Sequence, residues 1–194
     1  MAVGSAAMVQ GKDTTARWEP ARHDKDDWLD TPGAKHRLIF DTTTADGFNE
    51  AILFASNYIL VNSSEYGLQK ADLAVVIVVR HHSTSFGYND AMWQKYGTSM
   101  AKHAQFEDPK TKQTPTANVH RTFFDSAARM GVQLAICSVA TGVVAGVIAS
   151  DTGGNQEAIH KELIANRLGS SLMVPAGIVA VNRAQERGYS IVTT

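Results

Sequence analysis

The segment 71–79 (ADLAVVIVV) constrains the fold more than any other part of the chain, because it is apolar at almost every position. A strand with one face in water alternates apolar and polar side chains, whereas a strand covered on both faces does not. This run of valine and isoleucine therefore predicts a strand in a mainly parallel sheet that has helices on both faces.

The rest of the chain supplies the other elements of such a sheet. Apolar runs predict further strands at 36–41, 132–137, 171–174 and 189–193, with helices between them. Three of these helices are expected to end at a glycine that a strand follows at once: Gly131, Gly169 and Gly188. Glycine accepts the left-handed conformation that closes a helix. The alternation predicts a flavodoxin-like, three-layer α/β/α fold with a mainly parallel five-stranded sheet.

Two helices have a defined apolar face in the sequence. The first is expected after the turn signal Asp46-Gly47, and the second is expected to begin at Thr116 as its N-cap. Spacings of three and four residues place these side chains on the inner faces: Phe48, Ile52, Ala55 and Ile59 in the first helix, and Val119, Phe123, Ala127 and Met130 in the second.

The 194 residues are enough for one domain with its own core. We expect an N-terminal arm at 1–34 and a single domain at 35–194, interrupted by an insertion at about 81–116 that is rich in aromatic and polar residues. An insertion of that length is typical of a lid, a binding loop or an oligomer contact. Trp18 and Trp28 suggest that the arm lies on a protein surface; a flexible leader is the alternative.

The composition excludes several classes of protein. Lys and Arg number 18 and Asp and Glu number 19, which argues against a nucleic-acid partner and leaves little charge to oppose self-association. The single cysteine excludes an internal disulfide. The apolar run 134–149 is shorter than the roughly 20 residues of a membrane span. We interpret this run as buried core.

The sequence is compatible with two cellular compartments. The segment 1–11 (MAVGSAAMVQG) lacks the positive start and sustained apolar stretch of an intact signal peptide. The chain as given is therefore expected in the cytoplasm. If this segment is the remnant of an export signal, the expected compartment is the periplasm.

The candidate site follows from the sheet, because ligands of such folds bind beyond the carboxyl ends of the strands. That edge is predicted to hold the catalytic candidate Cys137 and the binding candidates Asp41, Arg80, His81, His82 and Ser138. A thiol reacts as its thiolate, which a helix N-terminus or a nearby cation favours. Cys137 precedes an expected helix and Arg80 ends the neighbouring strand. The alternative is an inert, buried thiol.

The histidines and glycines point to a particular function less specifically than Cys137 does. Either His81 or His82 is a candidate proton donor or thiolate partner, and otherwise both are polar loop residues. No metal-ligand spacing, phosphate loop or dinucleotide motif occurs, so no metal or cofactor is expected. The alternative is a metal site formed by these histidines with His103 and His120. Gly142 and Gly146 are spaced for close helix packing.

Three segments of the chain match a known family: 128–141 (ARMGVQLAICSVAT), 174–192 (VPAGIVAVNRAQERGYSIV) and the early helix with Asn57. With them, residues from about 36 to 194 resemble the DsrE/DsrF-like (YchN-like) sulfur-relay family. The resemblance implies a homotrimer or homohexamer of flavodoxin-like subunits. It also implies that a cysteine carries sulfur as a persulfide, and Cys137 falls at that cysteine's position.

Two functional hypotheses remain. The first is a sulfur carrier or sulfurtransferase in which Cys137 accepts sulfur from a donor protein or a small anionic sulfur compound. The second is a non-catalytic, oligomeric ligand-binding or assembly protein of the same fold. Whether the protein is an enzyme depends on which of the two is right.

Overall fold

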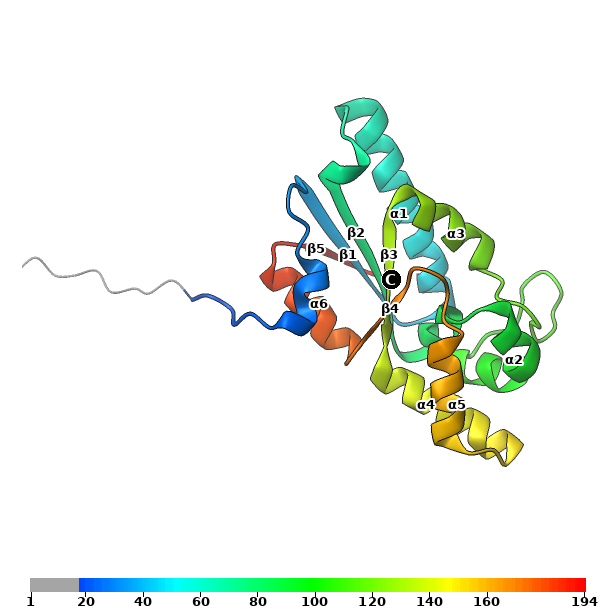
Figure 1. Cartoon of the computed structure of the whole chain (residues 1–194). Helices are drawn as coiled ribbons and strands as arrows, with labels where there is room; N and C mark the ends of the chain where they lie inside the picture. The colour runs from blue at the N-terminus through cyan, green and yellow to red at the C-terminus, as the bar shows by residue number, and fades with distance from the viewer. Residues whose placement is uncertain (1–17) are drawn as a thin grey trace, which may run out of the picture.

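The computed structural model describes residues 18–194, which fold around one five-stranded sheet (Figure 1). The strands lie in the order β4-β3-β2-β1-β5, and every neighbouring pair is parallel. Their bounds are β1 His36–Thr42, β2 Leu73–Val79, β3 Val132–Cys137, β4 Leu172–Val174 and β5 Ser190–Thr193. Helices cover both faces of the sheet, so the expected three-layer α/β/α architecture is confirmed.

The helices divide unequally between the two faces. They are α1 Ala45–Tyr66, α2 Asp90–Ala104, α3 Arg121–Met130, α4 Ser138–Thr152, α5 Gln156–Ala165 and α6 Gly177–Glu186. From β1 to β4 the chain advances in one direction across the sheet, so right-handed crossovers place α1 to α5 on one face. The return from β4 to β5 places α6 on the opposite face, as Figure 1 shows.

Two separate cores result from this division. The larger packs the inner sides of α1 to α5 on alternate residues of β1, β2 and β3. The smaller packs α6 on the residues between, which include Ile39, Val76, Val78 and Ala135. Alternate residues of a strand point to opposite faces of the sheet. When one residue of a strand belongs to a given core, the next residue therefore points to the other face.

The N-terminal arm joins the smaller core. A 3₁₀ helix, η1 at Asp24–Leu29, lies against α6, and Leu29 is fully buried there. The Tyr189 hydroxyl donates to the Leu29 carbonyl oxygen at 3.0 Å. Residues 24–30 are therefore part of the folded domain, while Trp18 is exposed. The segment 1–11, on which the two expected compartments depend, lies outside the described residues.

The segment 81–116 belongs to the larger core. It begins with a 3₁₀ helix, η3 at His81–Gly87, and continues into α2. Phe86, Trp93 and Met100 are fully buried within the core. These contacts make the segment part of the helical layer between β2 and β3.

The predicted start of the helix before β3 was wrong. This helix, α3, begins at Arg121 rather than at Thr116. The Asn118 side chain donates to the carbonyl oxygens of Phe86 and Tyr88, both at 2.8 Å, and so holds the preceding segment in a non-helical conformation. The inner face also differs from the prediction: Phe124 is fully buried, and Phe123 is 60% exposed.

Two other boundaries differ from the prediction. The helix expected to end at Gly169 is α5, and it ends at Ala165 because the chain turns to pair with the end of η3. The Leu168 N–H donates to the Gly87 carbonyl oxygen at 2.8 Å, and Ser170, not Gly169, has a positive φ. The Asp46-Gly47 pair lies inside the first turn of α1, whose N-cap is Thr44.

Candidate functional site

Cys137 lies at the point where the sheet changes the side of its connections. β3 leads into α4 on one face, and β4 leads into α6 on the other. The two strands are neighbours, and Cys137 pairs with Val174 in their register. Ligands of doubly wound sheets bind beyond the strand ends at such a switch point. Cys137 therefore stands at the position where this kind of fold usually places its ligand site.

Three of the predicted site residues share one face of the sheet. Each of them stands two positions after a residue of the smaller core. The pairs are Ile39 and Asp41, Val78 and Arg80, and Ala135 and Cys137. The alternation of strand side chains therefore directs all three toward the α6 face. Val79 pairs with Ile136, so the next residues, Arg80 and Cys137, lie at the same level on neighbouring strands.

Arg80 is fixed by Asp41. Its Nε and NH2 atoms donate to the two carboxylate oxygens at 2.6 and 2.9 Å, a bidentate pair with Asp41 almost buried. This hydrogen bond is the main reason that the pKa of Arg80 is raised; burial opposes the shift, and negative charge on Asp41 and on Cys137 adds to it. The pair keeps the guanidinium at the level of the thiol.

Gly177, the first residue of α6, lies directly on the Arg80 side chain. A Cβ atom at position 177 would stand 2.8 Å from the Cβ of Arg80 and 3.1 Å from its Cδ. Only a residue without a side chain allows α6 to begin here. The N-terminus of α6 therefore lies over Arg80 because position 177 is glycine.

Cys137 is the N-cap of α4. Its Sγ accepts a hydrogen bond from the Ala140 N–H at 3.4 Å, and the thiol is 6% exposed. Backbone N–H groups at a helix N-terminus lack partners within the helix, and the Sγ atom of Cys137 accepts from one of them here. Ser138, the first residue of α4, is half-buried beside it.

A buried hydroxyl chain supports the cysteine backbone from the larger core. The Tyr88 hydroxyl donates to Thr141 Oγ1 at 2.7 Å, and Thr141 donates to the Cys137 carbonyl oxygen at 2.8 Å. Burial raises the pKa of Tyr88, the bond to Thr141 opposes this rise, and charge at Cys137 adds to it. Tyr88 is therefore a neutral donor that holds the end of β3 in place.

The two histidines lie in a separate cluster. His82 Nδ1 is 2.5 Å from the His103 carbonyl oxygen in α2, and the rings of His81 and His82 are 3.9 Å apart. Burial first, and then positive charge at His82 and Arg80, lower the pKa of His81. His81 is exposed and has a φ of 56°, an uncommon conformation for a residue with a side chain. No hydrogen bond joins either ring to Cys137 in the described part of the chain.

Sequence reasoning missed Tyr88, Thr141 and Gly177. Thr141 stands four residues after Cys137, where a helical hydroxyl reaches back to a carbonyl oxygen, so spacing offered a signal for it. Tyr88 and Gly177 come from distant segments and carry no such signal. Between residues 18 and 194 no helix is long and apolar enough to cross a membrane, and no three His, Cys, Asp or Glu side chains are grouped to hold a metal ion.

We compared the chain with family models, curated proteins and solved structures. No family model matches the chain, and no curated protein matches it. Among solved structures, the chain is similar to a protein of unknown function, MTH1491 from Methanobacterium thermoautotrophicum, with 13% identity and a TM-score of 0.46. That match covers 82% of this chain and 99% of the other.

Proposed function

We propose that Cys137 is a sulfur-accepting thiol and that the protein is a sulfur carrier of the DsrE/DsrF-like kind. The observation that carries the proposal is the position of Cys137 as the N-cap of α4 at the switch point of the sheet. The N-terminus of α4 lies at Cys137, and Arg80, at the same level on the neighbouring strand, lies against the N-terminus of α6. Each of these groups favours negative charge. The site suits a thiolate that meets an anionic donor.

Thiosulfate serves as the simplest donor of this class. The Cys137 thiolate attacks the outer sulfur atom of thiosulfate and forms a new S–S bond. The S–S bond of the donor breaks, and sulfite leaves with its electron pair. The product is a persulfide anion on Cys137, so charge and atoms balance without an added oxidant or reductant. A thiol of the acceptor removes the outer sulfur in a second exchange.

The supporting residues have distinct roles. Asp41 is the positioning residue, because it holds the Arg80 guanidinium through two hydrogen bonds. The positive charge of Arg80 attracts the anionic donor. The Ala140 N–H stabilises the anionic sulfur before and after transfer. Ser138 N–H and hydroxyl groups at the start of α4 are further donors for the anion.

The low exposure of the thiol favours a second candidate, a non-catalytic binding or assembly protein. A cysteine that is 6% exposed resembles the buried structural thiols of many cores. On this view the Arg80–Asp41 pair only ties β1 to β2. The two candidates differ in whether Cys137 reacts in the folded protein.

Intact-mass spectrometry distinguishes them. The full chain is incubated with thiosulfate, and separately with an inorganic polysulfide, and the mass is recorded without reducing agent. The carrier predicts an added mass of about 32 Da per sulfur atom on Cys137, removed by dithiothreitol. Cys137→Ser should show no added mass. A chain that takes up no sulfur from either donor contradicts the proposal.

A matched variant tests the site rather than the thiol alone. Asp41→Asn with Arg80→Gln removes the ion pair but leaves Cys137 and α4 intact. We expect sulfur uptake from thiosulfate to slow by about tenfold or more, because the anion loses its guanidinium partner. Uptake at the wild-type rate would show that Arg80 does not contact the donor.

A further inference from the structure

Four fully buried hydroxyl groups lie behind the candidate site, on the side of the larger core. They belong to Thr42, Ser83, Tyr88 and Thr141. Tyr88 is a member of the larger core, and Thr42 stands two positions after Phe40, another member. A hydroxyl in an apolar core is unfavourable unless it is hydrogen-bonded, and a bonded one holds its partner in a single arrangement. The partners of these four groups therefore show what they hold in place.

Ser83 holds the backbone of Arg80. Its Oγ atom accepts a hydrogen bond from the Arg80 N–H at 3.0 Å, and its proton has two acceptors at 2.9 Å, the carbonyl oxygens of Thr42 and Arg80. Thr42 Oγ1 donates to the Val78 carbonyl oxygen at 2.8 Å and lies 3.1 Å from Ser83 Oγ. One buried serine thus joins the ends of β1 and β2, on the opposite face of the sheet from the Arg80–Asp41 ion pair.

The turn between Arg80 and Ser83 has an uncommon backbone conformation. His81 has a φ of 56°, which is unfavourable for a residue with a side chain. Conformations of this kind cluster at functional sites, where the surrounding contacts hold them. The contacts here are the hydrogen bonds of Ser83 and that of His82 Nδ1, which lies 2.5 Å from the His103 carbonyl oxygen.

The far end of the same segment holds Cys137. Tyr88 follows η3 directly, and its hydroxyl reaches the Cys137 carbonyl oxygen through Thr141, with hydrogen bonds of 2.7 and 2.8 Å. Because the Thr141 hydroxyl accepts from Tyr88, its single proton is directed at Cys137. The Asn118 side chain in turn fixes the Tyr88 carbonyl oxygen at 2.8 Å.

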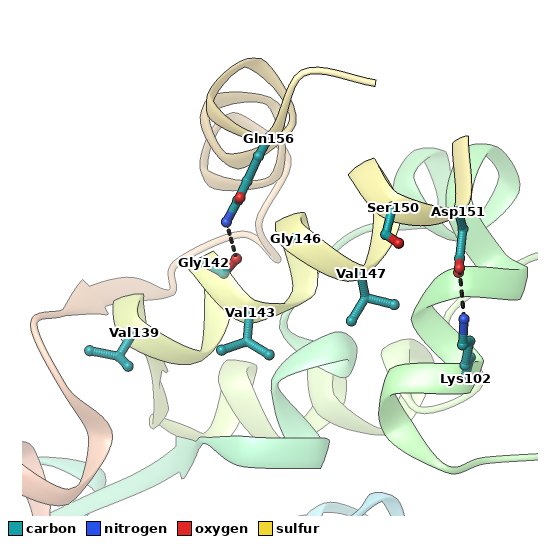
Figure 2. A pocket seen from close by; sticks show the side chains of 9 residues that line it. All are labelled: Lys102, Val139, Gly142, Val143, Gly146, Val147, Ser150, Asp151 and Gln156. Atoms are coloured by element: carbon teal, nitrogen blue, oxygen red, sulfur yellow. Dashed lines mark hydrogen bonds and ion pairs between the residues drawn. The ribbon is translucent and has the colours of Figure 1, made fainter. Parts of the chain in front are cut away.

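The helix that follows this segment, α2, holds the other end of α4. Asn89 caps α2 by accepting from the Met92 N–H at 3.3 Å, so the helix begins directly after the segment. Lys102 of α2 and Asp151 of α4 are joined at 2.7 Å, and Figure 2 shows this pair at the C-terminal end of α4. Residues 81–104 therefore bond to α4 near both of its ends.

We infer that the segment 81–88 is the positioning element of the candidate site. Ser83 is the positioning residue for Arg80. Tyr88 positions Cys137 through Thr141. One turn of chain thus fixes the guanidinium relative to the sulfur atom from the opposite face of the sheet. The use that the inference gives to these residues rests on the proposed function, whereas the arrangement itself is measurable without sulfur transfer.

Two thiol reagents of different charge test the position of Arg80. Methyl methanethiosulfonate is neutral and its 2-sulfonatoethyl analogue is anionic, and both form a disulfide with Cys137. The ratio of their rates in the native full chain reports positive charge at the sulfur atom. We expect Ser83→Ala to lower the anionic-to-neutral ratio by about threefold or more, toward the ratio of Arg80→Gln.

Ser85→Ala is the matched control. It removes another buried hydroxyl of the same 3₁₀ helix, one that donates to the Met100 carbonyl oxygen at 3.1 Å and contacts neither Arg80 nor Cys137 through a hydrogen bond. A loss of stability alone affects both serine variants, so Ser85→Ala should keep the wild-type ratio. An equal fall in the two variants, or an unchanged ratio in Ser83→Ala, overturns the inference.

The same ratio tests the hydroxyls behind Cys137. Tyr88→Phe and Thr141→Val each remove a hydroxyl with little change of shape, and each should lower the ratio because the sulfur atom shifts relative to the guanidinium. Thr141→Ser retains the hydroxyl and should keep the wild-type ratio. A Thr141→Val protein with the wild-type ratio overturns the inference.

Urea denaturation tests the role of Ser83 without any thiol chemistry. A native Cys137 that reacts with neither reagent contradicts the proposed function and leaves this second test in force. Arg80→Gln should lower the urea midpoint, and this fall should be about half as large in a Ser83→Ala background, because a displaced guanidinium no longer meets Asp41. Additive falls overturn the inference whatever the thiol does.

Discussion

Arg80 and Asp41 form a bidentate ion pair that ties the ends of β1 and β2 together at the level of Cys137. Asp41 is 4% exposed, and the side chain of Arg80 is 27% exposed. Its two bonds fix the guanidinium plane, and Gly177 lets α6 begin above it. The charge of the site is therefore set by residues that do not themselves react.

Removing only the arginine should destabilise the fold. Arg80→Gln leaves the Asp41 carboxylate buried without its partner, and we expect a loss of about 2 kcal/mol in the free energy of unfolding. Urea denaturation at neutral pH measures this loss. The double variant with Asp41→Asn should recover at least half of it. A double variant no more stable than Arg80→Gln would mean that the pair itself is not the cause.

A methyl group at position 177 should be costly because of Arg80. Gly177→Ala places a Cβ atom 2.8 Å from the Cβ of Arg80, so the helix or the arginine has to move. We expect a loss of about 1–3 kcal/mol, the usual range for overpacking, in urea denaturation. Gly169→Ala is the control, since an added Cβ atom meets nothing within 4 Å there and should change the stability little. Equal effects at the two positions would contradict the close contact.

Stability should fall as the solution becomes acidic. Burial lowers the pKa of His103 and of His120 from 6.5 to about 4; the positive charge of His82 and His81 adds to the shift at His103, and Asp46 opposes it at His120. The unfolded chain therefore binds more protons than the folded one between pH 6.5 and 4. The free energy of unfolding decreases as pH falls through this window, by roughly 3 kcal/mol or less for His120 and by a smaller amount for His103, whose charge solvent partly screens.

Urea denaturation at pH 7.5, 6 and 5 measures this slope. His120 Nε2 is buried without a hydrogen-bond partner in the described part of the chain, among Phe48, Phe86 and Phe106. His120→Leu should therefore flatten the slope. A protein equally stable at pH 7.5 and 5 would show that neither histidine is held neutral in the fold.

The sequence pattern predicted the sheet because a strand that is buried on both faces needs apolar residues at nearly every position. The apolar run 71–79 and the glycine joints at Gly131 and Gly188 correspond to strands and helix ends in the structure. The strand-end rule brought Asp41, Arg80 and Cys137 to one edge, and the structure gives all three the same face.

Details that depend on distant contacts could not be predicted. Phe123 and Phe124 are adjacent, and only Phe124 is buried, where its ring lies beside Phe48 of α1. The start of α3 also differs from the prediction. That start is set by Asn118, whose partners lie some thirty residues earlier in the chain. The roles of Tyr88 and Gly177 likewise arise from segments that meet only in the folded protein.

The rate at which native Cys137 reacts with a small thiol reagent tests the central claim most directly. The reagent is methyl methanethiosulfonate at neutral pH, and the same chain unfolded in urea is the reference. A thiolate held at the start of α4 predicts a native rate within about tenfold of the unfolded rate despite its low exposure. Protection of the native thiol by more than about a hundredfold would contradict a sulfur-accepting role for Cys137.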